Sequence, residues 1–190
     1  IVDTIGGNLA MQQDVDGRMG MYERYYPLFV EIEEEGIVHD NPAFEAFAGI
    51  TFHWASPLKV VDSLSSSIEV DTLVMTSPKS YAVDSVFALN PRILWDVKFA
   101  RAEEAGMIDQ FPIAMHLSGK FRSLYANDTV STEVVREVEN NDLIVIGNSN
   151  FIQGGTANSS IGVNTIFMRN LVDWFTVNDG LISIRVETIC

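Results

Sequence analysis

The stretch LIVIGNSNFIQGG, residues 143–155, joins an apolar run to a group of polar side chains. The apolar run ends at Gly147, and Asn148, Ser149 and Asn150 follow it. A buried strand that ends in such a loop is typical of the edge of an α/β sheet, where these folds usually bind their ligands. The stretch therefore predicts either the mouth of a binding site or a turn with a structural role only.

Strand and helix patterns alternate on both sides of this stretch. Strands are expected at residues 68–76, 111–126, 143–147 and 181–186. Helices are expected at about residues 42–48, 131–139 and 165–176. Asn164 is the expected cap of the last helix, and residues 81–110 predict loops or short helical turns. This alternation favours an α/β layered sandwich that forms a single domain over residues 1–190.

The composition excludes several classes of function. The formal net charge of −14 argues against binding to nucleic acid or to an anionic membrane surface. The single cysteine, Cys190, excludes an internal disulfide framework and a Cys-rich zinc site. No uncharged apolar run approaches the roughly 20 residues that span a bilayer. Because the chain begins with Ile1 rather than Met, we expect it to be a fragment of a longer protein.

Ser149 is a candidate nucleophile of a hydrolase, because Gly147 and Ser149 match the start of a Gly-x-Ser-x-Gly turn. Phe151 stands where the second glycine of that motif belongs, and no histidine follows the serine. An acid such as Asp3 is the other catalytic candidate. The alternative for Asn148, Ser149 and Asn150 is hydrogen bonding to the backbone of their own loop, which Asn and Ser commonly do.

Metal chemistry has little support in the sequence. The three histidines are His39, His53 and His116, and they are far apart in the sequence. They show neither His-x-x-x-His nor Glu-x-x-His spacing, which would indicate a ligand set. We therefore expect neither a metal nor another cofactor.

Cationic side chains gather on one predicted strand face within residues 111–126. His116, Lys120 and Arg122 alternate there with apolar residues. They could bind an anionic ligand or an acidic partner, and the alternative is a solvated face balanced by nearby acids. Separately, an aromatic group at Tyr22–Phe29 either packs in the core or contacts a sugar or a partner.

The predicted helix at 165–176 carries an apolar stripe that includes Trp174. Asn170 lies beside this stripe, where a buried amide would need a partner. We expect Asn170 to hydrogen-bond the 147–151 turn and to fix the helix against the sheet. Asn164, Asn170 and Trp174 are thus predicted to be structural residues.

The ordered set of motifs from Val145 onward resembles a known family. It consists of V-I-G-N-S-N-F, Asn164, then F-M-R-N-L-V-D-W-F and L-I-S-I-R. Earlier segments, Y-Y-P-L-F, H-D-N-P and F-H-W-A-S-P-L, fit the same pattern. The chain resembles the auxiliary, substrate-binding-like component of ABC-type transport systems involved in gliding motility.

This resemblance implies a mostly parallel central sheet related to the glutamine-amidotransferase-like fold, in a truncated domain whose N-terminal half would precede Ile1. It implies a location on the extracytoplasmic face of a bacterial membrane, with membrane contact only through segments outside this chain. ABC permease and ATPase subunits are the implied partners. Asn148 and Asn150 stand where the family usually has acids, so any ligand that those acids bind is in question here.

These observations together favour a non-enzymatic, extracytoplasmic domain that binds a ligand or a partner. Asn148, Ser149 and Asn150, with His116, Lys120 and Arg122, are the predicted contacts of a small polar or sugar ligand. Two alternatives remain open at this point. One is a hydrolase with a serine or a carboxylate at the sheet edge, and the other is a purely structural module that docks onto membrane subunits.

Overall fold

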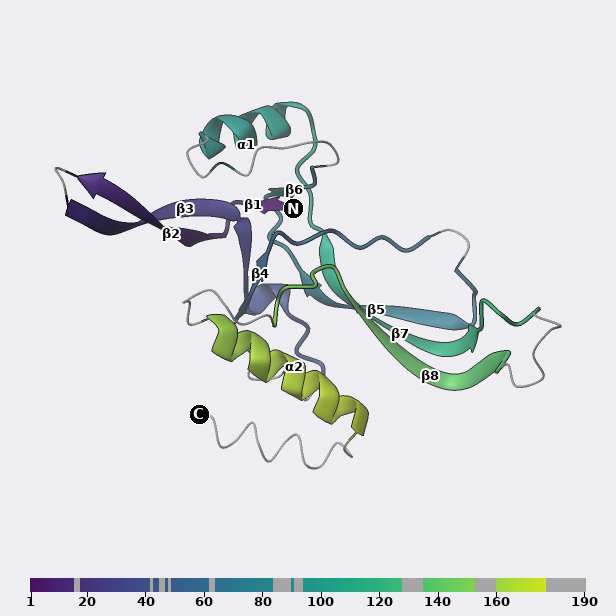
Figure 1. Cartoon of the computed structure of the whole chain (residues 1–190). Coiled ribbons are helices and arrows are strands. Elements are labelled where there is room, and N and C mark those ends of the chain that lie inside the picture. Colours follow the sequence, from purple (N-terminus) through teal and green to yellow (C-terminus); the bar gives the residue numbers. More distant parts are fainter. Residues whose placement is uncertain are drawn as a thin grey trace.

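The computed structural model describes residues 1–15, 18–41, 43–44, 47, 49–61, 64–83, 90, 94–127, 135–152 and 160–176. Within them lie three small sheets and two α-helices (Figure 1). The first sheet pairs β1 (Val2–Asp3) with β6 (Ser80–Tyr81). The second has the order β2 (Gly6–Val15), β3 (Arg18–Glu33) and β4 (Gly49–His53). The third has the order β5 (Ile68–Met75), β7 (Pro112–Arg122) and β8 (Glu137–Ile146).

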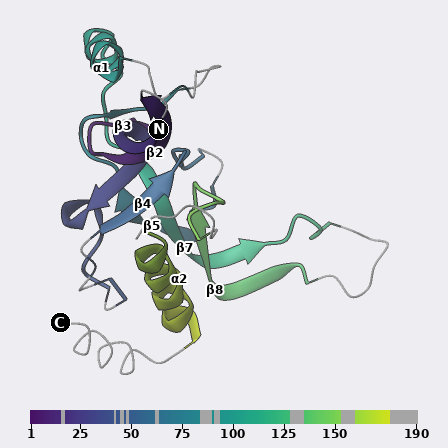
Figure 2. The ribbon, with the colours of Figure 1, turned by 60° about the vertical axis from the view of Figure 1, so that its left-hand side comes forward.

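The two helices lie on opposite sides of β4. Helix α1 (Trp95–Glu104) is at one end of the molecule and α2 (Ser160–Thr176) is at the other, as both ribbon views show (Figures 1 and 2). A short 3-10 turn, η1 (Glu34–Gly36), follows β3. The third sheet extends away from the helices in both views.

The hairpin of β2 and β3 projects from the body of the molecule (Figure 1). Its register is regular from Asn8↔Tyr25 to Val15↔Arg18 and shifts between Gly6 and Asn8. Pro27 lies on β3 opposite this irregularity, a position that suits proline because it has no N–H to donate. A Cβ at Gly6 would lie 2.6 Å from the Cα of Pro27, so the strands approach there only because Gly6 has no side chain.

Two hydrophobic cores hold these elements together. The main core contains residues of β3, β4, β5, β7 and α2, with Val30, Phe44, Phe52, Ile113 and Phe167 fully buried. The smaller core joins β1 and β3 to α1, and its residues are Val2, Tyr26, Leu28, Phe29, Tyr81, Trp95 and Ala102. The aromatic group predicted at 22–29 is therefore core at Tyr26 and Phe29, whose rings meet edge to face at 4.9 Å.

The expected α/β layered sandwich with a mostly parallel, glutamine-amidotransferase-like sheet is wrong. Every strand pair in the described part of the chain is antiparallel. A parallel pair needs a crossover connection, usually a helix, between its two strands. Here only two residues separate β2 from β3, and α2 follows the last described strand, so it connects no two strands of the described chain.

Several local expectations also need correction. Residues 137–139, predicted to be helical, begin strand β8, and residues 95–104 form helix α1 rather than loops or short turns. Helix α2 begins at Ser160, so Asn164 lies inside it and does not cap it. The strands expected at 68–76 and 111–126 are confirmed as β5 and β7. The closing strand expected at 181–186 lies outside the described residues.

Candidate functional site

The turn at 147–151 is part of the structural framework. The N–H of Gly147 donates to the carbonyl of Ile113 at 2.8 Å, and its own carbonyl accepts from the N–H of Ser56 at 2.7 Å. A Cβ at this position would lie 2.0 Å from the Ser56 carbonyl oxygen. Glycine is therefore required at 147 for close approach of two backbone segments, rather than for an exposed catalytic elbow.

Asn148 connects this turn to β4. Its side chain is buried, its Nδ2 donates to the carbonyl of His53, and its Oδ1 accepts the N–H of Asn150 at 2.7 Å. Ser149 and Asn150 are exposed. Thus Asn148 already uses both ends of its amide inside the protein, which is the loop-stabilising behaviour common for Asn.

Ser149 has no histidine bonded to it among the described residues. The ring nitrogens of His39 contact the carbonyls of Glu34 and Phe44, and His116 bonds Asp142. The ring of His53 stacks on Phe29 at 3.9 Å, and burial lowers its pKa. The arrangement that a serine nucleophile needs is not assembled in this part of the chain.

Asp3, the other catalytic candidate, is a buried structural acid. Its carboxylate accepts the N–H of Ile5 and the N–H of Ser77, each at 2.9 Å, and the hydroxyl of Ser77. These bonds tie β1 to the turn that precedes β6. The described residues contain no group of three or more His, Cys, Asp or Glu side chains that could hold a metal ion.

Two amides on α2 fix the helix to the body of the protein. Asn164 is 5% exposed, and its Nδ2 donates to the carbonyls of Thr51 and Phe151, both at 2.7 Å. Its Oδ1 accepts the N–H of Thr51 at 3.3 Å. The bond to the 147–151 turn that we expected from Asn170 thus comes from Asn164. Asn170 instead donates to the carbonyl of Ala43 at 2.8 Å.

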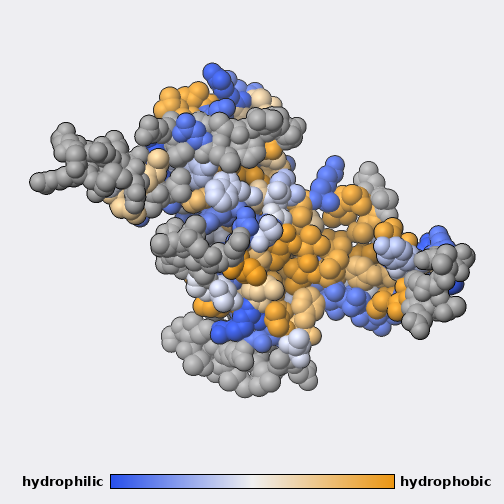
Figure 3. All heavy atoms as spheres, viewed as in Figure 1, coloured by the Kyte–Doolittle hydropathy of each residue, from blue (hydrophilic) through white to orange (hydrophobic). Residues whose placement is uncertain are grey.

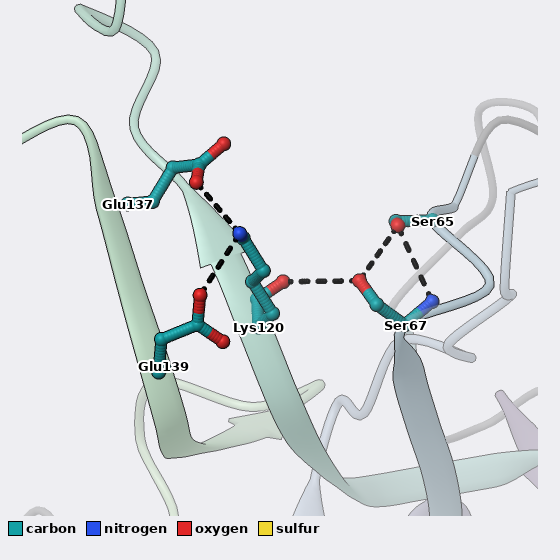
Figure 4. A network of polar contacts seen from close by, with 5 residues as sticks. All are labelled: Ser65, Ser67, Lys120, Glu137 and Glu139. Atoms are coloured by element: carbon teal, nitrogen blue, oxygen red, sulfur yellow. Dashed lines mark hydrogen bonds and ion pairs between the residues drawn. The ribbon is translucent and has the colours of Figure 1, made fainter.

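The predicted cationic side chains are all engaged by neighbours. Lys120 contacts Glu137 at 2.7 Å and Glu139 at 2.9 Å, and these hydrogen bonds and charges raise the pKa of its ammonium (Figure 4). Arg122 donates to Asn127 at 2.7 Å. Lys120 therefore matches the alternative from the sequence, a solvated strand face balanced by nearby acids.

His116 lies in a buried position between two acids and an aromatic side chain. Its Nε2 is 2.8 Å from Asp142, and its Nδ1 is 3.7 Å from Asp71. The ring of Trp174 packs against the ring of His116, with centroids 4.8 Å apart. The C-terminal part of α2 therefore covers the third sheet at His116. His116 is thus a link between α2 and the sheet rather than an exposed cation.

A pocket of about 430 Å³ opens beside His116, near one end of the third sheet. It is lined by hydroxyl, amide and carboxylate side chains and one glycine: Ser66, Ser67, Glu69, Ser118, Gly119, Asn140, Asn141 and Asp142. Glu69, Ser118 and Asp142 are in register across the three strands, so they share a face with Asp71 and His116 two residues along.

Backbone irregularities shape this pocket. The register of β7 and β8 shifts between Gly119 and Phe121, and Gly119 has a φ of 131°. A Cβ at Gly119 would lie 2.1 Å from the carbonyl oxygen of Ser67. Asn140 has a φ of 49°, which few residues other than glycine adopt. The irregularity interrupts the ladder between β7 and β8 beside the pocket, and β-bulges are over-represented next to active sites.

The pocket residues were not singled out from the sequence. The run Asn140-Asn141-Asp142 interrupts an apolar pattern, and Ser118-Gly119 does the same in β7. Each of these two segments is a turn signal by itself, and only the antiparallel register of β7 and β8 brings them together. A mostly parallel sheet, as predicted from the sequence, would not pair these two segments.

A family model described as "ABC-type uncharacterized transport system" matches residues 1–171 of the chain. No curated protein and no solved structure matches it. None of the described helices is long and apolar enough to cross a membrane.

Proposed function

The chain belongs to the ABC-type uncharacterized transport system family, as an auxiliary component, and from this premise we propose that it is a non-enzymatic domain that binds the permease subunit of its transporter. The ATPase subunit completes the proposed complex without touching this domain. The proposal also places the domain on the extracytoplasmic side of the membrane.

One observation carries the docking proposal: an exposed apolar face on the third sheet. Val70, Leu117 and Leu143 are in register across its strands, and Val145 lies two residues further along β8. Leu143 is 46% exposed and Val145 is 36% exposed. These side chains lie on the face opposite His116, because neighbouring residues of a strand point to opposite faces. We call these four residues the apolar face.

The surroundings of the apolar face indicate the chemistry of its partner. Hydrophobic residues also gather over the region of β5 and β7 in Figure 3. The chain as a whole has a net charge of −14, which favours a cationic surface on the partner. A partner surface with an apolar centre and a rim of Lys and Arg would complement it.

The non-enzymatic part of the proposal is supported by the use of Asn148 and Asp3 as structural residues and by the separation of Ser149 from histidine. The extracytoplasmic location and a role in gliding motility are supported by the motif resemblance alone. Fusion of the intact protein to alkaline phosphatase, which is active only outside the cytoplasm, tests the location. Loss of gliding on deletion of the gene tests the role.

Co-purification with the permease tests the docking proposal. Leu143→Glu adds a charge to the apolar face and is expected to reduce recovery of the permease at least tenfold, because an uncompensated charge in an interface costs more than about 1.4 kcal/mol. Leu124→Glu is the matched control, since Leu124 is 91% exposed and lies outside the third sheet. Equal recovery with both variants would contradict the proposal.

A further inference from the structure

We propose that the pocket beside Asp142 binds a small protonated amine that also carries hydroxyl groups, such as an amino sugar. This site is separate from the apolar face, because Glu69, Ser118 and Asp142 point to the other side of the sheet. Permease docking at the apolar face and amine binding in the pocket can therefore be tested independently.

The charge of the pocket favours a cation. Among the described residues, two carboxylates, Glu69 and Asp142, line it, and no Lys or Arg does. Lys120 is close in sequence, but its ammonium is held by Glu137 and Glu139 on β8. Asp142 bonds His116, whereas Glu69 makes no ion pair with described residues, so an anionic ligand would meet the uncompensated charge of Glu69. An ammonium group would instead form charge-assisted hydrogen bonds with the carboxylates.

The neutral lining favours hydroxyl groups on the same ligand. Ser66, Ser118, Asn140 and Asn141 can each donate and accept hydrogen bonds. Their side chains form no hydrogen bond with other described residues, so these groups face the pocket with unused capacity. Hydroxyl groups of a ligand, which also donate and accept, match such a lining. None of the described residues that line the pocket is aromatic, so recognition would rest on polar contacts rather than on ring stacking.

The pocket wall is fixed before any ligand arrives. The hydroxyl of Ser67 contacts that of Ser65 at 2.8 Å and donates to the carbonyl of Lys120 at 3.4 Å (Figure 4). The N–H of Ser67 also donates to Ser65 Oγ at 3.3 Å. The volume of about 430 Å³ lies within the range of about 300–1,000 Å³ that is usual for small-molecule sites. A preformed wall lowers the ordering cost of binding.

A nuclear magnetic resonance titration with two matched sugars tests the proposal. D-glucosamine carries an ammonium group, and N-acetyl-D-glucosamine has a similar shape without the charge. The amide resonance of Gly119 and the side-chain amides of Asn140 and Asn141 are the reporters. We expect saturable shifts of these resonances with glucosamine and a dissociation constant at least tenfold weaker with the acetylated sugar.

Variants identify the charge that is responsible. Glu69→Gln should weaken glucosamine binding about tenfold, which corresponds to about 1.4 kcal/mol. Glu69 makes no ion pair with described residues, so this variant should fold normally, and its amide spectrum checks that. Glu103→Gln on α1 removes the same charge far from the pocket and should leave binding unchanged. Absence of saturable shifts, equal binding of the two sugars, or equal weakening by both variants would overturn the proposal.

Discussion

Replacement of Asn164 by alanine tests how α2 is held against β4. The substitution removes three hydrogen bonds: two that Nδ2 donates to the carbonyls of Thr51 and Phe151, and one that Oδ1 accepts from Thr51. Each contributes about 1 kcal/mol net, and alanine returns about 0.6 kcal/mol through its better helix propensity. Asn164→Ala should therefore lower the free energy of unfolding by about 2 to 3 kcal/mol.

Asn170→Ala is the matched control on the same helix. Among the described residues its side chain makes a single such bond, to the carbonyl of Ala43, so the same arithmetic gives a loss of about 0.4 kcal/mol. Urea denaturation, monitored by Trp fluorescence, measures the free energy of unfolding of both variants. With a slope of about 2 kcal/mol per molar urea, the midpoints of the two variants should differ by about 1 M. If Asn164→Ala lowers the free energy of unfolding no more than Asn170→Ala does, the hydrogen bonds of Asn164 do not hold α2 against β4.

Three further predictions concern single positions. Gly147→Ala places a methyl group 2.0 Å from the carbonyl oxygen of Ser56, so it should lower the free energy of unfolding by about 2 kcal/mol in the urea assay; an unchanged midpoint would refute this. Asn140→Gly should raise the free energy of unfolding by about 0.5 kcal/mol, because φ is 49° there, and a lower melting temperature would count against it. Burial, with a smaller effect of the Asp3 charge, raises the pKa of Tyr25 to about 12 from its ordinary 10.0. The unfolded chain releases this proton at a lower pH than the folded chain, so the free energy of unfolding should fall as the pH rises from about 10 to about 12. Near-ultraviolet titration, with Tyr25→Phe as the reference, measures the pKa of Tyr25 in the folded protein. A value near 10 would contradict the prediction.

The strands could be predicted from the sequence better than their arrangement. Residues 68–75 and 112–122 carry a clear period of two, and the structure forms β5 and β7 there. The same period says nothing about which strand lies beside which, or in which direction. Residues 137–139 belong to the helix that the sequence predicts at 131–139. They form a strand because β7 supplies the hydrogen-bonding partners.

For the candidate site, the sequence located polar residues but not their roles. The sequence predicts that Asn148 contacts a ligand or bonds its own loop, and that Asn164 caps the last helix. In the structure both side chains also donate to backbone carbonyls more than 90 residues away in sequence, at His53 and Thr51. Such contacts depend on the tertiary arrangement and leave no local pattern. The pocket was missed for the same reason, since Glu69 and Asp142 become neighbours only through β7.

Strand β3 has a mechanical consequence for a component of a transport machine. Its 16 residues run without a break from the projecting hairpin, through Tyr26 and Leu28 of the smaller core, to Val30 and Ile32 of the main core. A load applied to the hairpin is therefore transmitted to both cores along one covalent strand. From Val30 and Ile32 it passes directly to Phe52 and Ile50 on β4, and Asn164 passes it from β4 to α2. A push at one extremity would thus reach the opposite side of the molecule through stiff, hydrogen-bonded elements.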